Sequence, residues 1–498
     1  MNYADLFHVT LPETALELAA LLVLLVDLVF LRKAGCGVRT AVAAAVGVAG
    51  CVASMFAIGV QTGAGLSLGD TLVLTNGGIA AVAQMGVLAL TILTLLLLAD
   101  ASFTKHVGEF VAVILMSAAG GLLIAAAQDL LVIFIGLELL SLGLYILTAF
   151  AKRSEKSAES ALKYYLFGGM SAAFLLFGFS YLYGLTGSTN LHAIALGAIS
   201  SFGAGNPLFY VALVLVAAGL GFKVAAAPFH LWAPDTYEGA PTPAAAFIAS
   251  VSKVASFALL ISFSSALAHA VAPTMACCPR PLVGLAHQWG LLLAVLAGVS
   301  MVVGNLAALA QTSVRRLLAY SAVAHAGYVV LGLAYFTQDQ RSAQAILYYV
   351  LTYGLTTVGA FGVISVVERA TGSDKMDAFL GLSKKNPLLA GVLLVLFLSL
   401  AGIPPLVGFW AKFNLFAAVL SVGAGAVPFG LVALALAMSA VSLYYYLQVL
   451  KRAYVMPAAD DVPVKAGAVT TLVLVAIAAA VVALGCFPVM LQNWIAGF

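Results

Sequence analysis

The sequence predicts an all-α protein that crosses a membrane many times, and three observations support this prediction. Hydrophobic residues make up 63% of the 498 residues and charged residues only 8%, whereas soluble domains carry about 25% charge. The mean hydropathy is +1.12. Apolar runs of about 20 residues, the length of a membrane-spanning helix, follow one another along the chain. Helices are expected because lipid offers no partners for backbone N–H and C=O groups.

Apolar windows bounded by charged and turn residues predict fourteen spans. The first is expected to be a retained span, because acids stand where a cleaved signal peptide would carry Lys or Arg. The predicted spans are 11–31, 40–61, 77–99, 107–127, 129–150, 160–184, 207–232, 243–270, 287–311, 315–336, 341–368, 387–422, 428–451 and 466–494.

The distribution of basic residues predicts the orientation, since cytoplasmic loops carry an excess of Lys and Arg. With an external N-terminus, the external loops hold only Arg280 and Arg341. Both termini are therefore expected on the periplasmic side of a bacterial plasma membrane. The internal loops then hold Arg32, Lys33, Arg39, Lys105, Lys152, Arg153, Lys156, Lys163, Arg315, Arg316, Arg369, Lys375, Lys384, Lys385, Lys451, Arg452 and Lys465.

The remaining three basic residues, Lys223, Lys253 and Lys412, fall inside spans, and so does Glu138 in the fifth span. A lysine at mid-bilayer costs about 2.5–3.5 kcal/mol on insertion scales. Lys223 lies roughly 16 residues, or ~24 Å, into its span, so its ammonium reaches the interface only with difficulty. Lys253 lies nearer a helix end, and partial snorkelling remains open for it.

Prolines accompany two of these lysines. Pro228 cannot donate to the carbonyl of Val224, and Pro404 and Pro405 free two further carbonyls, those of Leu400 and Ala401. The twelfth span would measure ~54 Å as a straight helix, far more than the ~30 Å hydrocarbon core. We therefore expect spans seven and twelve to be broken helices, which membranes tolerate where they line a polar cavity.

The two predicted broken spans are the seventh and the twelfth. Because they are separated by an odd number of spans, five, they cross the membrane in opposite directions. This pattern predicts an inverted repeat of two five-helix bundles, the architecture of many ion transporters. The expected organisation is peripheral helices in 1–105, a first half in 106–272, an inverted second half in 285–455, and a last helix in 456–498.

These buried charges predict proton handling. Burial disfavours the charge on a lysine and a nearby carboxylate favours it, so a pairing of Glu138 with Lys223 could load and release a proton. His325 and His230 are further titratable groups suited to a relay. Lys163 heads its span close to the same region.

A structural alternative stays open for each candidate. The lysines could belong to static ion pairs, and Glu138 could hold two helices together. His325 could be a hydrogen-bonded helix-packing residue, and His230 a loop-packing residue. Lys163 could simply follow the positive-inside rule.

The sequence contains no motif for metal, iron–sulfur or nucleotide binding. The five cysteines form no CxxC pair and no metal-binding spacing, and neither GxGxxG after a strand nor a phosphate-binding loop occurs. We therefore expect no cofactor and no metal in this chain. Scattered basic residues with a net charge of +3 give no indication of nucleic-acid binding.

Three segments resemble the antiporter-like membrane subunits of respiratory complex I: KVAAAPFHLWAPDTYEGAPTPAAAFIASVSKVASF (223–257), QTSVRRLLAYSAVAHAGYVVLGL (311–333) and SLAGIPPLVGFWAKFNLF (399–416). The PDxYEGAPTP form is similar to the N-type branch of that family. The resemblance implies that Glu138, Lys223, Lys253 and Lys412 match the family's charged relay positions.

The resemblance also implies the function and the partners. A proton-pumping module would be driven by NADH oxidation and quinone reduction, with FMN, iron–sulfur clusters and quinone in partner subunits. The expected partners are membrane-arm subunits of the K/J/A side and of the M and L types, the peripheral arm, and the lipid bilayer. An Mrp-like cation/proton antiporter is the alternative, although the dominance of lysine over carboxylate favours protons over sodium.

Overall fold

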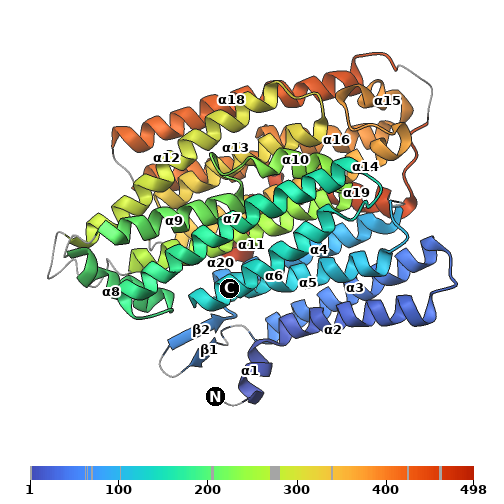
Figure 1. Ribbon diagram of the computed structural model, residues 1–498. Coiled ribbons are helices and arrows are strands. Elements are labelled where there is room, and N and C mark those ends of the chain that lie inside the picture. Colours follow the sequence, from blue (N-terminus) through green and yellow to red (C-terminus); the bar gives the residue numbers. More distant parts are fainter. Residues whose placement is uncertain are drawn as a thin grey trace.

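The computed structural model shows a bundle of long helices that lie side by side (Figure 1). It describes residues 3–61, 63, 65–68, 71–100, 103–203, 207–269, 281–337, 340–422, 425–458 and 463–497. Within these ranges the chain is helical apart from its connections and one small hairpin, so the all-α prediction is confirmed.

The long helices are α2 (Leu11–Leu25), α3 (Cys36–Val60), α4 (Ile79–Leu97), α5 (Val107–Ala126), α6 (Leu130–Thr148), α7 (Glu155–Thr186), α9 (Pro207–Val224), α11 (Thr242–His269), α12 (Pro281–Leu309), α13 (Val314–Ala334), α14 (Gln340–Thr371), α16 (Pro387–Ala401), α17 (Val407–Val422), α18 (Ala426–Tyr454) and α19 (Ala468–Cys486). The shorter elements are α1 (Tyr3–Val9), the π-helical turn η1 (Val26–Phe30), the 3₁₀ turns η2 (Leu98–Asp100) and η4 (Met376–Phe379), α8 (Leu191–Gly203), α10 (Trp232–Gly239), α15 (Leu382–Lys385), α20 (Pro488–Ala496) and the strands β1 (Gly65–Leu68) and β2 (Thr71–Thr75).

Twelve helices of the described residues are long and apolar enough to cross a membrane. They coincide with twelve of the predicted spans. The predicted first span is α2, 15 residues long, continued by η1. The predicted twelfth span is divided between α16 and α17, of 15 and 16 residues. Neither α16 nor α17 reaches the length of a spanning helix by itself, because the chain leaves the helical path between them.

Several short elements have no counterpart among the predicted spans. The hairpin of β1 and β2 occupies the connection after α3, where Thr71–Thr75 consists of three aliphatic residues with a threonine at each end, a composition that favours a strand. Leu74 of β2 also bridges to Ala127 at the end of α5. The predicted seventh span, 207–232, is helical only as far as Val224, where α9 ends; residues 225–231 are non-helical, and α10 begins at Trp232. Apolar windows detect long helices and are insensitive to elements this short.

α11 is the central helix of the bundle. The most apolar window of α11 is buried along its whole length, whereas only 22% of the corresponding window of α18 is buried. α11 contacts helices from both parts of the chain, including α4, α5 and α14. Lys253 on this helix is therefore surrounded by protein.

Successive helices cross the bundle in opposite directions and bring alternate loops to opposite ends. We call the end with the loops before α3, α5, α7, α13, α16 and α19 the basic face, because seventeen of the chain's Lys and Arg residues lie in or beside these loops. Adjacent loops touch there, and Ser313 bridges to Lys375. The hairpin and α8 lie toward the opposite end (Figure 1).

Candidate functional site

All three lysines predicted inside spans are buried. The exposed fractions are 8% for Lys223, 1% for Lys253 and 6% for Lys412. Lys253 is the most deeply buried of the three, which does not support the snorkelled alternative. The three ammonium groups differ in the atoms that accept their hydrogen bonds, and these acceptors determine how easily each lysine can change its charge.

The first lysine site lies where α9 ends. Ala225 has a positive φ of 57°, and the backbone stays non-helical up to α10. Because Pro228 has no N–H, the carbonyl of Val224 lacks its usual helical donor. The Nζ of Lys253, on α11, donates a hydrogen bond to this carbonyl. The break in the helix is thus filled by an ammonium group from the central helix.

Other freed groups at this break also have partners. The indole Nε1 of Trp232 donates to the carbonyl of Phe222 at 2.9 Å. The backbone N–H of Ala227 donates to the hydroxyl of Ser300, on α12, at 2.8 Å. The Nζ of Lys253 lies 5.8 Å from the centroid of the Trp232 ring. The break is therefore a fixed structure held from α11 and α12.

The second lysine site lies between α16 and α17. The Nζ of Lys412 donates to the carbonyl of Leu400 at 3.2 Å and to that of Ala401 at 2.8 Å. These are the two carbonyls that Pro404 and Pro405 leave without helical donors. A third acceptor is the hydroxyl of Ser439, on α18, at 2.7 Å. The three donors of the ammonium group thus have three oxygen acceptors.

Gly402 makes the second site possible. It ends α16 with φ of 88°, a conformation that favours glycine. A Cβ at this position would lie 3.0 Å from Cδ and 3.1 Å from Nζ of Lys412. The lysine therefore packs directly on the glycine, in space that a side chain would need.

Lys223 has a different partner. Its Nζ donates to the hydroxyl of Ser141 on α6. Glu138 lies one turn earlier on the same helix, but no ion pair between Glu138 and Lys223 occurs among the described residues. The carboxylate still interacts electrostatically with the lysine, and its Oε1 is buried without a hydrogen-bond partner. Ser141 was missed by the sequence analysis; its spacing of three residues from Glu138 on a helix was the available signal.

The two candidate histidines, His325 and His230, lie in different surroundings. His325 is buried on α13, and its Nδ1 is 2.8 Å from the hydroxyl of Tyr349. A small space beside the second lysine site is lined by His325, Tyr349, Leu400 and neighbouring residues. His230 is buried between the first break and α10, and its Nδ1 has no hydrogen-bond partner. Of the two candidate histidines, His325 is therefore the one placed beside Lys412 and its carbonyl acceptors.

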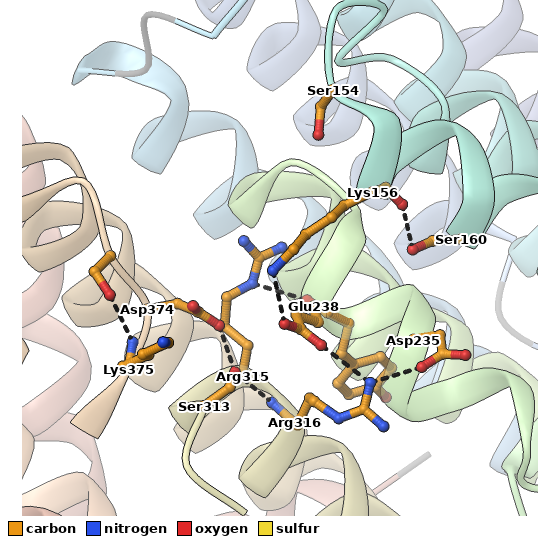
Figure 2. Close-up of polar contacts among 12 residues, drawn as sticks. Ser154, Lys156, Ser160, Asp235, Glu238, Ser313, Arg315, Arg316, Asp374 and Lys375 are labelled. Carbon is orange, nitrogen blue, oxygen red and sulfur yellow. Dashed lines mark hydrogen bonds and ion pairs between the residues drawn. The ribbon is translucent and has the colours of Figure 1, made fainter. Parts of the chain in front are cut away.

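Lys163 belongs to a charged network on the basic face. Its Nζ pairs with Asp235 of α10 at 2.8 Å, and Arg316 of α13 pairs with the same carboxylate at 2.6 Å. Glu238 accepts from Arg316 at 3.0 Å and from Lys156 of α7 at 3.1 Å. Figure 2 shows Glu238 between these two cations. The network ties α10 to α7 and α13 near the solvent.

The carboxylates of this network are held in the charged form. Partial burial by itself would raise the pKa of Asp235, but hydrogen bonds from Lys163 and Arg316 outweigh it and lower the pKa below its ordinary value. The pKa of Glu238 is lowered in the same way, against burial, by Arg316 and Lys156. These groups therefore stay ionised at neutral pH.

Arg315 is a buried cation that the sequence analysis assigned only to an internal loop. It is 4% exposed, and its Nε donates to the carbonyl of Tyr237 at 2.8 Å. Its Nη2 donates to the carbonyl of Ala240. Its Nη1 donates to the carboxylate of Glu368, on α14, at 3.1 Å. Arg315 thereby joins the turn before α11 to the second half of the chain.

Together the fold and the site define a class of protein: a polytopic helical membrane protein with lysines bound at interrupted helices, as in proteins that translocate ions. The family model described as "NADH:quinone oxidoreductase/Mrp antiporter, TM" matches residues 127–437. The chain is 47% identical to NADH-quinone oxidoreductase subunit N 2 of Acidobacterium capsulatum, with 99% of each chain covered. The chain belongs to the NADH:quinone oxidoreductase/Mrp antiporter family, and the resemblance noted in the sequence is confirmed.

Solved structures agree with this assignment. A chain of respiratory complex I from Thermus thermophilus, with bound aureothin, is 34% identical to this chain. The match covers 97% of this chain and 98% of the other, with a TM-score of 0.76. A chain of the Mrp complex from Dietzia sp. has a TM-score of 0.77 at 21% identity, covering 96% of each chain. At that identity the likeness concerns the fold alone.

Proposed function

We propose that this chain is the N-type membrane-arm subunit of a proton-translocating NADH:quinone oxidoreductase. Electron transfer from NADH through FMN and iron–sulfur centres to quinone takes place in partner subunits and drives proton transfer here. The observation that carries the proposal is the presence of three buried lysines, two of them bound to carbonyls at helix interruptions, in a chain nearly half identical to a subunit of that name.

The lysine sites are suited to reversible protonation. Burial disfavours an ammonium group, whereas carbonyl and hydroxyl acceptors favour it. No carboxylate forms an ion pair with Lys223, Lys253 or Lys412 among the described residues. The direct hydrogen-bond partners of each ammonium group are therefore neutral hydroxyl and carbonyl groups, and Glu138 acts on Lys223 only from a distance. A change in charge nearby can then release the proton without the cost of separating a contact ion pair.

The relay assigned to these sites consists of Glu138, Lys223, Lys253 and Lys412. Glu138 acts on Lys223 from one helical turn beyond Ser141, and movement of its proton shifts the charge balance of the lysine. His325 is suited to connect the central helix to Lys412, since it borders the second lysine site. His230 and Lys163 are assigned, with less support, to the path from the basic face.

The proposed topology is fourteen spans with both termini on the periplasmic side of a bacterial plasma membrane. The helices of 106–272 and 285–455 form the two inverted halves, with 1–105 and 456–498 at the periphery. The two interruptions, after Val224 and after Ala401, support this division. The concentration of Lys and Arg on the basic face supports the orientation.

The proposed partners are the other membrane-arm subunits, of the K/J/A side and of the M and L types, and the peripheral arm. An Mrp-like cation/proton antiporter is the second candidate function, favoured by the similarity in fold to the Mrp complex. Co-purification separates the two. Flavin and iron–sulfur subunits accompany the chain in the first case and are absent in the second.

The test is NADH-driven proton uptake and quinone reduction, measured together in vesicles that carry the assembled complex with Lys223→Ala. Both rates are expected to fall while subunit content stays normal, because the proton path is coupled to electron transfer. Lys465→Ala, which removes an exposed lysine of the basic face, is the matched control. Unchanged rates with Lys223→Ala would show that the lysine is structural.

A further inference from the structure

A cavity lies at the basic face, beside the end of α18. It has a volume of about 440 Å³ and lies between the turn before α13, the segment around η4 and the basic end of α18. Its polar lining includes Gln311, Lys375, Asp377, Tyr445, Gln448 and Arg452. We call it the α18 cavity. Protons from the basic face can reach its inner wall, where Tyr445 lies.

A column of buried polar side chains continues from this wall. The hydroxyl of Tyr445 donates to Oδ1 of Asn305, on α12, at 3.1 Å. The Nδ2 of Asn305 donates to the hydroxyl of Tyr328, on α13, also at 3.1 Å. The ring centroid of Tyr328 is 5.4 Å from Nζ of Lys412. The three column residues are at most 1% exposed. Hydrogen bonds thus join Tyr445, in the wall of the α18 cavity, to Tyr328 through Asn305, and the ring of Tyr328 contacts the second lysine site.

The side-chain amide of Asn305 is the one group of this column that does not exchange protons readily. A phenol hydroxyl can accept one proton while it releases another, but a carboxamide does not ionise and holds its protons on nitrogen. Both N–H groups of Asn305 are engaged, since Nδ2 also donates to the carbonyl of Met301 at 2.8 Å. Because a neutral amide is a very weak base and a very weak acid, its oxygen does not take up a proton from Tyr445, and its N–H group does not release one to Tyr328.

The packing leaves little space for a path around the amide. Gly304 precedes Asn305, and a Cβ there would lie 2.5 Å from the backbone nitrogen of Ala324, so α12 and α13 are in backbone contact. On the α18 side, the hydroxyls of Ser321 and Tyr446 are bonded to each other, and among the described residues no hydrogen bond joins this pair to Tyr328 or Lys412. Asn305 is therefore the point at which the column carries hydrogen bonds but does not transfer protons.

We propose that Asn305 is a proton barrier that separates the α18 cavity from Lys412. The proposal rests on the proposed function, because a barrier is needed only if Lys412 carries protons that must not return to the basic face. Asn305 is a positioning residue in this scheme: it holds Tyr445 and Tyr328 in place and interrupts proton exchange between them. A carboxyl group of the same size would take up a proton on one oxygen and release it from the other.

The test compares Asn305→Asp with Asn305→Leu in the assembled complex. Vesicles receive an acid pulse without NADH, and the decay of the imposed pH difference is followed. Asn305→Asp is expected to speed the decay several-fold, whereas Asn305→Leu is expected to match the wild type. Adding Lys412→Ala to Asn305→Asp should restore the slow decay. Wild-type decay with Asn305→Asp would overturn the proposal, and so would equal leaks in the Asp and Leu variants or a leak that persists without Lys412.

Asn305→Ser covers the case in which the carboxyl variant does not assemble. A serine hydroxyl is uncharged and can relay a proton, so this variant should also leak, and an unchanged decay would overturn the proposal. The acid pulse requires no electron transfer, so the leak is measured independently of pumping. If the wild type pumps and no Asn305 variant leaks, the proposed function stands and the barrier is refuted. If the wild type does not pump, the proposed function fails whatever the leak.

Discussion

Gly402→Ala tests whether the second lysine site must have the geometry described above. At φ of 88°, an alanine costs roughly 1–2 kcal/mol relative to a relaxed conformation. Its methyl group would also lie 3.0 Å from Cδ and 3.1 Å from Nζ of Lys412, so the lysine must move. Loss of one hydrogen bond between the ammonium and a carbonyl adds about 1.5–3 kcal/mol. The sum is about 2.5–5 kcal/mol, of which the hydrogen-bond part falls on the charged form of the site.

The assay pairs thermal melting of the solubilised complex with the ratio of protons taken up to quinone reduced in vesicles. We expect Gly402→Ala to lower the melting temperature and to reduce proton uptake although Lys412 is still present. Gly391→Ala is the matched control, because it lies on the same helix, α16, and an added Cβ there meets no atom within 4 Å. Wild-type melting and pumping with Gly402→Ala would refute the reasoning, as would equal damage from Gly391→Ala.

Three further perturbations follow from the same geometry. Ser141→Ala removes the hydroxyl acceptor of Lys223 and should reduce proton uptake, since a hydrogen bond to a charged group contributes about 1.5–3 kcal/mol; unchanged uptake would mean that the hydroxyl is dispensable. Lys253→Met leaves the carbonyl of Val224 without a donor and should destabilise the complex by about 1–3 kcal/mol; an unchanged melting temperature would contradict the assigned bond. Asp235 has a lowered pKa, so its stabilising contribution is present at neutral pH and is lost as the pH falls below about 4. Asp235→Asn should therefore lower the melting temperature at pH 7 by the equivalent of about 1 kcal/mol or less and weaken its acid dependence; identical melting curves across pH would argue against the network.

Much of the candidate site follows from the sequence because its components are local. Proline lacks an N–H wherever it occurs, so the unpaired carbonyls of Val224, Leu400 and Ala401 could be named in advance. A lysine within an apolar run is equally visible, since burial of the run implies burial of the charge. The resemblance to the complex I family rested on short motifs around the same residues and is confirmed by identity over nearly the whole chain.

The elements that escaped prediction are short or depend on tertiary contacts. α8, α10 and the hairpin of β1 and β2 are too short for an apolar window of about 20 residues. Arg315 lies in a loop by sequence, yet its contacts with the turn before α11 and with α14 bury it. Its 4% exposure arises from packing that no local pattern encodes.

The sequence by itself determined that the chain is a membrane bundle, that three lysines lie within it, and that prolines leave carbonyls unpaired beside two of them. Only the tertiary structure decided which group accepts a hydrogen bond from each buried polar side chain. Lys253 reaches a carbonyl 29 positions away, Lys223 meets Ser141 82 positions away, and Asn305 meets Tyr445 140 positions away. The physical reason is that hydrophobicity and a missing N–H are properties of a residue and its neighbours, whereas a hydrogen-bond partner is selected by the close packing of helices distant in sequence.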